Sequence, residues 1–402
     1  MSDKVRFYLE QSVAELEDLR KKELFTKQEL AVIMRKRTDH EHRISGRTVK
    51  PRDFLKYAEY EINVERLRKK RVKRLGNKDV GGKSGISDWA GPRRIMFIFD
   101  RSTKRFPGEI QLWLQYLEYA KQQKAIHVIN KIFTTMLQLH PTKPKLWILA
   151  AKHESDENAS MKAARYILQR SLRFNYDSEL LWYEYIKLEL IYVSKILARR
   201  KLLGLDLDTE EQQAQKEQDE EDEESEAHIE LPDIKEQVKD DLKALPEADM
   251  SMLGNPQTNP ALRGDVALAI YDASMERAKT VDAKYDFSLK IIELFDSFID
   301  LDRAHLSKHV IDYLSHTQAS PKTLFLSTTL PVRYVSHDDP TFPDMIKLMI
   351  TKYNKSLSLE EKTPELKQHL REFLTSKYLE PTLEPALDQN IRLVLQSFTK
   401  KL

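Results

Sequence analysis

The sequence predicts an all-α protein that folds as an α-solenoid, a stack of helix–turn–helix repeats with an N-terminal helical extension. Two observations lead to this prediction. The first is composition, because the 402 residues include only 10 glycines and 16 prolines, about 6% of the chain. These two residues make up roughly 12% of average proteins, and strand-rich folds need them for their many turns. The second observation is a sequence repeat with a period of about 34 residues, which is typical of stacked helix pairs.

Four aromatic anchors define the repeat, and each one begins a segment with apolar residues at helical spacing. The segments are FLKYAEYE (54–61), WLQYLEYA (113–120), WILAAKHE (147–154) and WYEYIKLE (182–189). Trp113, Trp147 and Trp182 therefore follow one another at nearly equal intervals. The interval from Phe54 to Trp113 is longer, and a glycine-rich loop at 76–90 accounts for the excess. The anchors are expected to lie in the solenoid core.

Changes in composition divide the chain into four predicted parts. Residues 1–50 form an N-terminal helical docking segment outside the repeat, and residues 51–205 form the repeat array. The run EQDEEDEESE (217–226) contains eight acidic residues in ten, which repel one another in a packed helix. The polar stretch 206–262 is therefore predicted to be an acidic disordered insertion. A solubilising linker is the favoured role of its acidic run, and the alternative is that the run attracts basic partners. Helical periodicity resumes over 263–402, where no tryptophan marks the number or register of the repeats.

Residues 1–45 are predicted to form two helices. Thr26 and Glu29 fit a capping box, in which each residue satisfies the backbone amide of the other at a helix N-terminus. Apolar residues recur at helical spacing over 7–19, and we expect the uncovered part of this face to dock a partner. The candidates are Phe7, Val13, Leu16 and Leu19.

The composition excludes several kinds of chemistry. The chain lacks cysteine, which excludes disulfides, thiolate zinc sites and cysteine nucleophiles. Its 66 basic and 64 acidic residues nearly cancel, so the global charge indicates no particular partner. The longest apolar run, LWILAA (146–151), is far shorter than the ~20 residues of a membrane-spanning helix. A soluble protein without membrane contact is expected.

A phosphate-binding loop is the first enzymatic alternative. Gly82-Lys83-Ser84 matches the end of the P-loop pattern, but the first glycine of that pattern falls on Asn77. The preceding RLRKKRVKRL (66–75) does not resemble the apolar strand that leads into a P-loop. The cluster Asp39-His40-Glu41-His42 places neighbouring side chains on different helix faces, which is unsuited to a metal. We therefore expect no catalytic, cofactor or metal site.

Acidic residues end three of the anchor segments, at the same position after the aromatic residue. They are Glu61, Glu154 and Glu189. A general acid or base would not recur in each repeat, so structural ion pairs with an adjoining helix are the favoured interpretation. Arg101 and Arg170 are the predicted partners, because they occupy equivalent positions before Trp113 and Trp182.

A dense basic run follows the first anchor segment and covers every face of the predicted helix. Two interpretations remain open and are compatible, a nuclear-localisation patch and contact with RNA phosphates. The candidates are Arg66, Arg68, Lys69, Lys70, Arg71, Lys73 and Arg74.

The anchors, the acids that follow them and the preceding arginines resemble the half-a-TPR (HAT) repeat. Four N-terminal stretches narrow the resemblance: FYLEQSVAELEDL (7–19), LFTKQEL (24–30), RTDHEHRI (37–44) and DFLKYAEYE (53–61) followed by the basic run. Together they resemble the small nucleolar RNA-associated protein six family. That resemblance is dense over residues 1–205.

The family resemblance implies a non-enzymatic scaffold in the UTP-B subcomplex of the small-subunit processome, located in the nucleus and nucleolus. The implied role is 18S pre-rRNA processing and assembly of the small ribosomal subunit. The implied partners are other UTP-B subunits, including WD-repeat proteins, and the particle that contains U-three small nucleolar RNA and pre-rRNA. No small-molecule substrate is implied. Two alternatives stay open: a HAT scaffold of a splicing or mRNA 3′-end processing machine, and a nucleotide-dependent enzyme.

Overall fold

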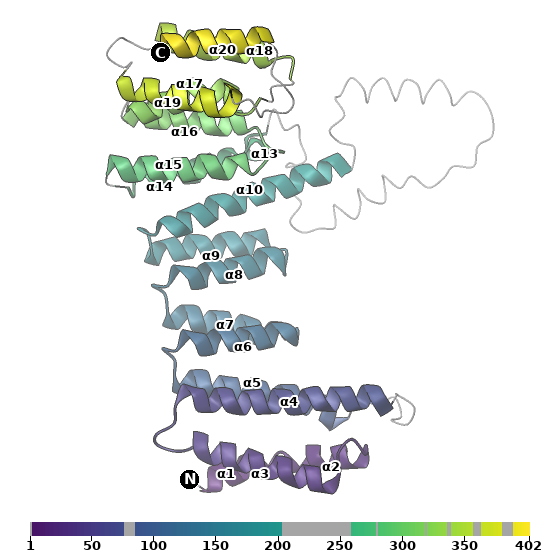
Figure 1. The fold of residues 1–402 in the computed structure, drawn as a ribbon. Coiled ribbons are helices and arrows are strands. Elements are labelled where there is room, and N and C mark those ends of the chain that lie inside the picture. The colour runs from purple at the N-terminus through teal and green to yellow at the C-terminus, as the bar shows by residue number, and fades with distance from the viewer. Residues whose placement is uncertain are drawn as a thin grey trace, which may run out of the picture. The chain divides into compact units, whose positions relative to one another are not determined.

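The computed structural model describes residues 2–75, 85–202, 259–278, 280–317, 320–335, 339–356, 363–379 and 389–402. Regular structure in these ranges is helical throughout, and consecutive helices stack in pairs (Figure 1). The predicted all-α class of stacked helix pairs is confirmed. The chain divides into two compact units, Met1–Leu146 and Trp147–Leu402.

The first unit begins with three helices where the sequence analysis expected two. They are α1 (Ser2–Glu10), α2 (Val13–Lys21) and α3 (Lys27–Ile44). The expected helix over 7–19 is interrupted at Gln11 and Ser12, where the Ser12 hydroxyl donates to the Leu9 carbonyl at 2.7 Å. The predicted capping box at the start of α3 is confirmed, since the Thr26 amide donates to Glu29 at 2.9 Å and the Glu29 amide donates to Thr26 at 3.3 Å.

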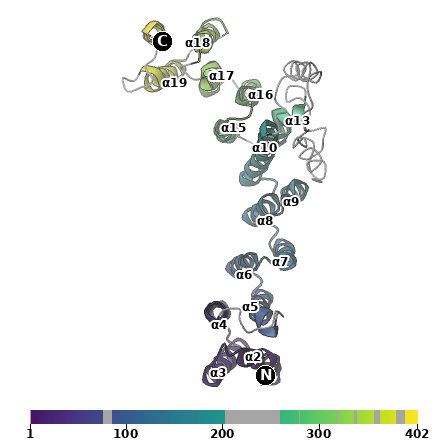
Figure 2. The same cartoon turned by 90° about the vertical axis from the view of Figure 1, so that its right-hand side faces the viewer.

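Four further helices complete the first unit: α4 (Pro51–Leu75), α5 (Ile86–Arg105), α6 (Ile110–Gln122) and α7 (Ile126–Leu139). Each packs on its neighbour in sequence, while α1 packs on α3 and α2 packs on α5. Figure 2 shows α6 and α7 nearly end-on and side by side. The loop predicted at 76–90 extends too far, because α5 already begins at Ile86. Residues 76–84, including Gly82, Lys83 and Ser84, lie outside the described residues.

The boundary between the units falls within α8 (Pro144–Asp156). The helices that follow are α9 (Met161–Phe174), α10 (Glu179–Leu202), α13 (Pro260–Arg263), α14 (Asp265–Met275), α15 (Val281–Asp296), α16 (Arg303–Thr317), α17 (Pro321–Arg333), α18 (Phe342–Thr351), α19 (Pro364–Leu374) and α20 (Gln389–Lys401). Short π-helical turns, Lys352–Ser356 and Thr375–Leu379, extend α18 and α19. Most of the predicted acidic insertion, residues 206–258, lies outside the described residues, and its predicted end at 262 falls inside α13.

Helices from both sides of residues 203–258 share one hydrophobic core. Trp182 and Ile186 of α10 pack in the same cluster as Tyr271 of α14 and Phe287 of α15. Further along the chain, α17 to α20 enclose a second core around Phe342. The described part of 263–402 is therefore built from packed helices like the rest of the second unit.

The four aromatic anchors Phe54, Trp113, Trp147 and Trp182 are all buried. The Trp113 indole N–H donates to the carbonyl of Pro107 at 3.0 Å, and that of Trp182 donates to Tyr176 at 2.8 Å. Both acceptors occupy the same position before the tryptophan. The position requires only a carbonyl group, so a tyrosine replaces a proline there without loss of the hydrogen bond.

Candidate functional site

The basic run on α4 separates into an exposed set and a set that turns toward other helices of the first unit. Arg66, Lys69, Lys70, Lys73 and Arg74 are exposed along the C-terminal half of the helix. Arg68 and Arg71 instead turn toward neighbouring helices and pair with carboxylates. These two residues are thus engaged within the first unit, which corrects the expectation that all seven form one charged surface.

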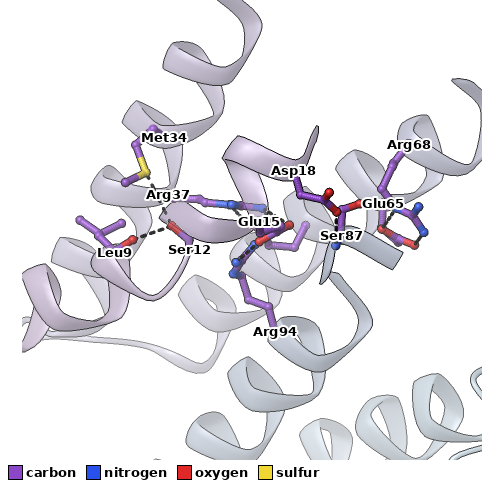
Figure 3. Close-up of polar contacts among 11 residues, drawn as sticks. Leu9, Ser12, Glu15, Asp18, Met34, Arg37, Glu65, Arg68, Ser87 and Arg94 are labelled. Carbon is purple, nitrogen blue, oxygen red and sulfur yellow. Dashed lines mark hydrogen bonds and ion pairs between the residues drawn. The ribbon is translucent and has the colours of Figure 1, made fainter. Parts of the chain in front are cut away.

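Arg68 joins α4 to α5. Its Nε and Nη2 each donate to Glu65 at 2.8 Å, and its Nη1 donates to Asp88 at 2.9 Å. Hydrogen bonding to Glu65 is the main cause that raises the pKa of Arg68. The Glu65 carboxylate rests on Gly91 of α5, where an added Cβ would come within 2.5 Å of Glu65 Oε2. Glycine at this position therefore lets the two helices approach around the ion pair (Figure 3 shows Glu65, Arg68 and the adjacent Ser87).

Arg71 of α4 contacts the turn between α2 and α3 and the start of α3. Its guanidinium donates to Glu29 at 2.6 and 2.9 Å and to the Leu24 carbonyl at 2.8 Å. It also lies over the Phe25 ring, 4.5 Å from the centroid. Hydrogen bonds from Arg71 and from the Thr26 amide lower the pKa of Glu29 to about 2. Arg71 is therefore engaged by the α2–α3 turn and by α3, through Leu24, Phe25 and Glu29.

A basic groove of about 340 Å³ separates the exposed face of α4 from the end of α6. Its lining includes Arg66, Lys69, Lys70 and Lys73 from α4, with Tyr119, Gln122 and Gln123 from α6. Glu65 is the acidic residue in this lining; it accepts two hydrogen bonds from Arg68, and the Lys69 Nζ lies 3.8 Å from it. The groove thus offers four cations and two amides, groups that bind phosphate oxygens.

Tyr119 adds a hydroxyl to the wall of this groove. The side chain is 6% exposed, and its hydroxyl has no hydrogen-bond partner among the described residues. Burial, together with the nearby Glu65, raises the pKa of Tyr119, so the hydroxyl stays protonated. It is consequently a neutral donor beside the cations, although sequence reasoning assigned Tyr119 no role.

The predicted docking residues do not share one face. Phe7 is 57% exposed and Val13 is also exposed, on α1 and α2 respectively. Leu16 is half-buried, and Leu19 is 2% exposed within a core cluster that includes Leu24. Leu19 belongs to the core of the first unit, which corrects its proposed docking role. Phe7 and Val13 remain available on the surface.

The acids of the repeat pair with different arginines from those expected. Glu61 accepts two hydrogen bonds from Arg37 on α3, at 2.8 and 2.9 Å. Glu189 accepts two from Arg165 on α9, both at 2.7 Å. Glu154 instead accepts from Asn158 at the end of its own helix, at 3.0 Å. Only Glu61 and Glu189 therefore link the two helices of a repeat.

The two arginines predicted as partners have other surroundings. Arg101 donates to both oxygens of Glu41 at 3.0 Å and lies over the Tyr8 ring, whereas Arg170 is exposed. Because Arg37 and Glu61 pair like Arg165 and Glu189, α3 is the first helix of a repeat. The boundary drawn at residue 50 therefore separates two helices that pack together as one pair.

Two acids and two arginines form a cluster among α2, α3, α4 and α5, and sequence reasoning missed three of its members, Glu15, Arg37 and Arg94. Figure 3 shows Glu15 between Arg37 and Arg94. Arg37 lies 3.5 Å from Glu15, Arg94 Nη2 hydrogen-bonds the other oxygen of Glu15, and Arg94 Nη1 lies 3.5 Å from Glu61. Burial alone would raise the pKa of Glu15, but Arg37 and Arg94 outweigh it and hold that pKa below its ordinary value.

The described residues contain no group of three or more histidine and acidic side chains placed to hold a metal ion. No helix in the same ranges is long and apolar enough to span a membrane.

Comparison with known proteins finds a family that the N-terminal part of the chain resembles. Residues 9–94 match the family model for U3 small nucleolar RNA-associated protein 6. The protein of that name in Schizosaccharomyces pombe is 43% identical over 212 residues, which cover 53% of this chain and 43% of the relative. The chain is thus similar to the U3 small nucleolar RNA-associated protein 6 family over this part of its length, and the predicted resemblance is confirmed.

More distant relatives that carry the same name align over a similar share of the chain. The homologue from Mus musculus is 33% identical over 196 residues, covering 49% of this chain and 32% of that protein. The homologue from Homo sapiens is 33% identical over 199 residues, with coverage of 49% and 32%. The chain thus spans less than half the length of the curated relatives it matches. A second family model, Suppressor of forked protein (Suf), matches residues 96–201, which begin in α5 and end in α10.

Proposed function

We propose that the protein is a non-enzymatic scaffold of the small-subunit processome, acting as a subunit of UTP-B in 18S pre-rRNA processing and small-subunit assembly. The observation that carries this proposal is the match of residues 9–94 to a family named for association with U3 small nucleolar RNA. The described part of this range comprises the end of α1, α2 to α4 with the whole basic run, and the start of α5. The place of action would be the nucleolus.

Stacked helix pairs suit a scaffold because each repeat presents its own surface and contacts mainly its neighbours. The partners we propose are other UTP-B subunits, including WD-repeat proteins, together with U3 small nucleolar RNA. Phe7 and Val13 offer exposed apolar contacts on the N-terminal helices for a protein partner. A catalytic role has no support from the buried acids, because Glu61 and Glu189 are each occupied by an arginine.

The experiment is affinity purification of the tagged chain from nuclear extract, divided into nuclease-treated and untreated halves. Mass spectrometry identifies proteins, and sequencing identifies RNA. We expect WD-repeat proteins to persist after nuclease treatment and U3 small nucleolar RNA to be enriched before it. Loss of all protein partners on nuclease treatment would contradict a protein-bridging scaffold. Enrichment of spliceosomal RNA or of mRNA 3′-end processing factors instead would support the alternative HAT-scaffold function.

Direct contact with RNA is a second function, favoured by the exposed part of the basic run. We propose that Arg66, Lys69, Lys70 and Lys73 contact phosphates of a single strand that follows the groove between α4 and α6. The Tyr119 hydroxyl and the nearby glutamine amides would add hydrogen bonds without further charge. Such contacts bind the backbone of RNA with little dependence on its sequence.

A further inference from the structure

A second cavity of about 410 Å³ lies on the first unit, and we call it the arginine pocket. Helices α1, α2, α3 and α5 contribute most of its lining, which includes Tyr8, Glu15, Arg37, Trp89, Arg94 and Phe97. Arg37 is 2% exposed, whereas Trp89 is 48% exposed. The pocket therefore combines a deeply buried cation with an aromatic wall that is open to solvent.

Two guanidinium nitrogens of the arginine pocket lack acceptors. Nη1 of Arg37 and Nη1 of Arg94 are buried and make no hydrogen bond within the described residues. The second of these has only a 3.5 Å ion-pair contact with Glu61. A buried donor left unpaired destabilises the folded chain, and more so when it is charged. An acceptor supplied from outside the chain would remove that destabilisation.

The acids around the pocket are already occupied. Glu15 is held by both pocket arginines, and Glu41 accepts two hydrogen bonds from Arg101. The lining contains three arginines, Arg37, Arg93 and Arg94, and two glutamates, Glu15 and Glu41. Behind the lining, Glu61 contacts Arg37 and Arg94 while Arg101 pairs with Glu41, so four arginines face three glutamates and one positive charge remains. A single carboxylate complements this excess, whereas a polyanion would bring further negative charge close to these glutamates. Carboxylates also match the fork of guanidinium donors in shape.

The aromatic wall favours a protein ligand. Tyr8 and Phe97 pack with ring centroids 5.4 Å apart, and the Arg93 guanidinium lies 5.5 Å from the Trp89 ring. Exposed Ile86 and Phe97 extend the apolar surface beside Trp89. Aromatic residues and arginines around a desolvated pocket are the groups that dominate the energy of protein–protein interfaces.

We propose that the arginine pocket binds an acidic side chain of a partner protein, presented between apolar residues. The carboxylate accepts hydrogen bonds from Nη1 of Arg37 and Nη1 of Arg94, and the flanking apolar side chains pack on Trp89 and Phe97. This site goes beyond the proposed scaffold role, and its test uses the purified chain alone. Failure of the pocket and failure of the proposed function are therefore separate results.

The test monitors tryptophan fluorescence of the full chain, quenched with acrylamide. Trp89 is exposed and the other three tryptophans are buried, so protection from quenching reports on the pocket. The probes are the blocked peptides acetyl-Leu-Asp-Phe-amide and acetyl-Leu-Asn-Phe-amide. We expect the aspartate peptide to protect Trp89 and the asparagine peptide to bind about tenfold more weakly, because it lacks the charge. Equal binding of the two peptides, or no protection by either, would overturn the proposal.

Variants and other anions complete the test. Arg94→Lys keeps the charge but replaces the planar guanidinium fork with a single nitrogen, and we expect it to weaken binding of the aspartate peptide several-fold. Arg105→Lys, at the exposed end of the same helix, should have no effect. Comparison of the two peptides on the unaltered chain does not depend on either variant folding. Stronger protection by inorganic phosphate or uridine 5′-monophosphate than by the aspartate peptide would make this a phosphate site and overturn the proposal.

Discussion

Arg165 on α9 donates two hydrogen bonds of 2.7 Å to the carboxylate of Glu189, which lies further along the chain on α10. Arg37 and Glu61 have the same separation in sequence, with distances of 2.8 and 2.9 Å. The arginine-to-anchor spacing is identical in the two pairs, with Phe54 as the anchor of one and Trp182 as the anchor of the other. The shorter spacing from the anchor to the acid is identical as well. The carboxylates of Glu61 and Glu189 are buried, so each pair sets the register of two helices from inside the repeat.

Removing Arg165 is expected to destabilise the second unit. Arg165→Ala leaves the Glu189 carboxylate, 2% exposed, without its partner, and breaking a buried pair in this way costs about 3–5 kcal/mol. Urea denaturation followed by circular dichroism measures the loss of unfolding free energy. Arg170→Ala on the same helix is the matched control, because that residue is exposed and its change should cost less than about 0.5 kcal/mol. Equal losses for the two variants would contradict the assignment.

Arg68 is expected to affect stability rather than surface charge. Arg68→Gln leaves Glu65 and Asp88 without their guanidinium, and we expect a loss of about 3 kcal/mol in unfolding free energy. Lys70→Gln, on the exposed side of α4, should leave the urea midpoint unchanged. If both variants unfold like the unaltered chain, the buried role of Arg68 is wrong.

Sequence reasoning reached the helical class because amphipathic spacing arises from local backbone geometry, which the residues report directly. It chose the wrong arginines because several lie on the same predicted helix. Arg170 is five positions from Arg165, about 140° around an α-helix, and only packing decides which one faces Glu189. One sequence signal could have identified the partner of Glu189. Residues that face each other in an antiparallel helix pair lie at equal distances in sequence from the turn between the helices. The midpoint of Arg165 and Glu189 is Asp177, which lies in the loop between α9 and α10.

The basic run was also only partly predictable, because the sequence does not show which of its cations turn inward. Seven cations on one helix indicate a charged surface, but the sequence does not reveal that Glu29 and Asp88 approach α4 from other helices. Those two acids draw Arg71 and Arg68 inward. The break between α1 and α2 was also hidden, because the bond from Ser12 to the Leu9 carbonyl competes locally with a continuous helix.

Glu29 should make stability depend on pH in the acid range. Its pKa is about 2 in the folded chain against an ordinary value of 4.5, so the folded state binds fewer protons than the unfolded state. The stabilisation is complete above about pH 4.5 and is lost as the pH falls toward 2. We expect Glu29→Gln to lower the urea midpoint at neutral pH, with the gap to the unaltered chain closing across this window.

Glu59→Gln provides the control for that titration, because Glu59 is an exposed glutamate on α4. Its effect on the urea midpoint should be small at every pH. A gap for Glu29→Gln that stays constant from neutral pH to pH 2 would contradict the ion pair with Arg71.

RNA binding through the basic groove predicts a defined salt dependence. Replacing Lys69, Lys70 and Lys73 with glutamine should weaken binding to oligouridylate and reduce the slope of log affinity against log salt by about 2, since each phosphate contact contributes about 0.7 for a single strand. Fluorescence anisotropy over a series of salt concentrations measures this slope. The matched control replaces Lys143, Lys145 and Lys162, three exposed lysines outside α4, and should leave the slope nearly unchanged. A similar reduction in both triple variants would mean that the chain binds RNA through diffuse charge and that the groove has no special role.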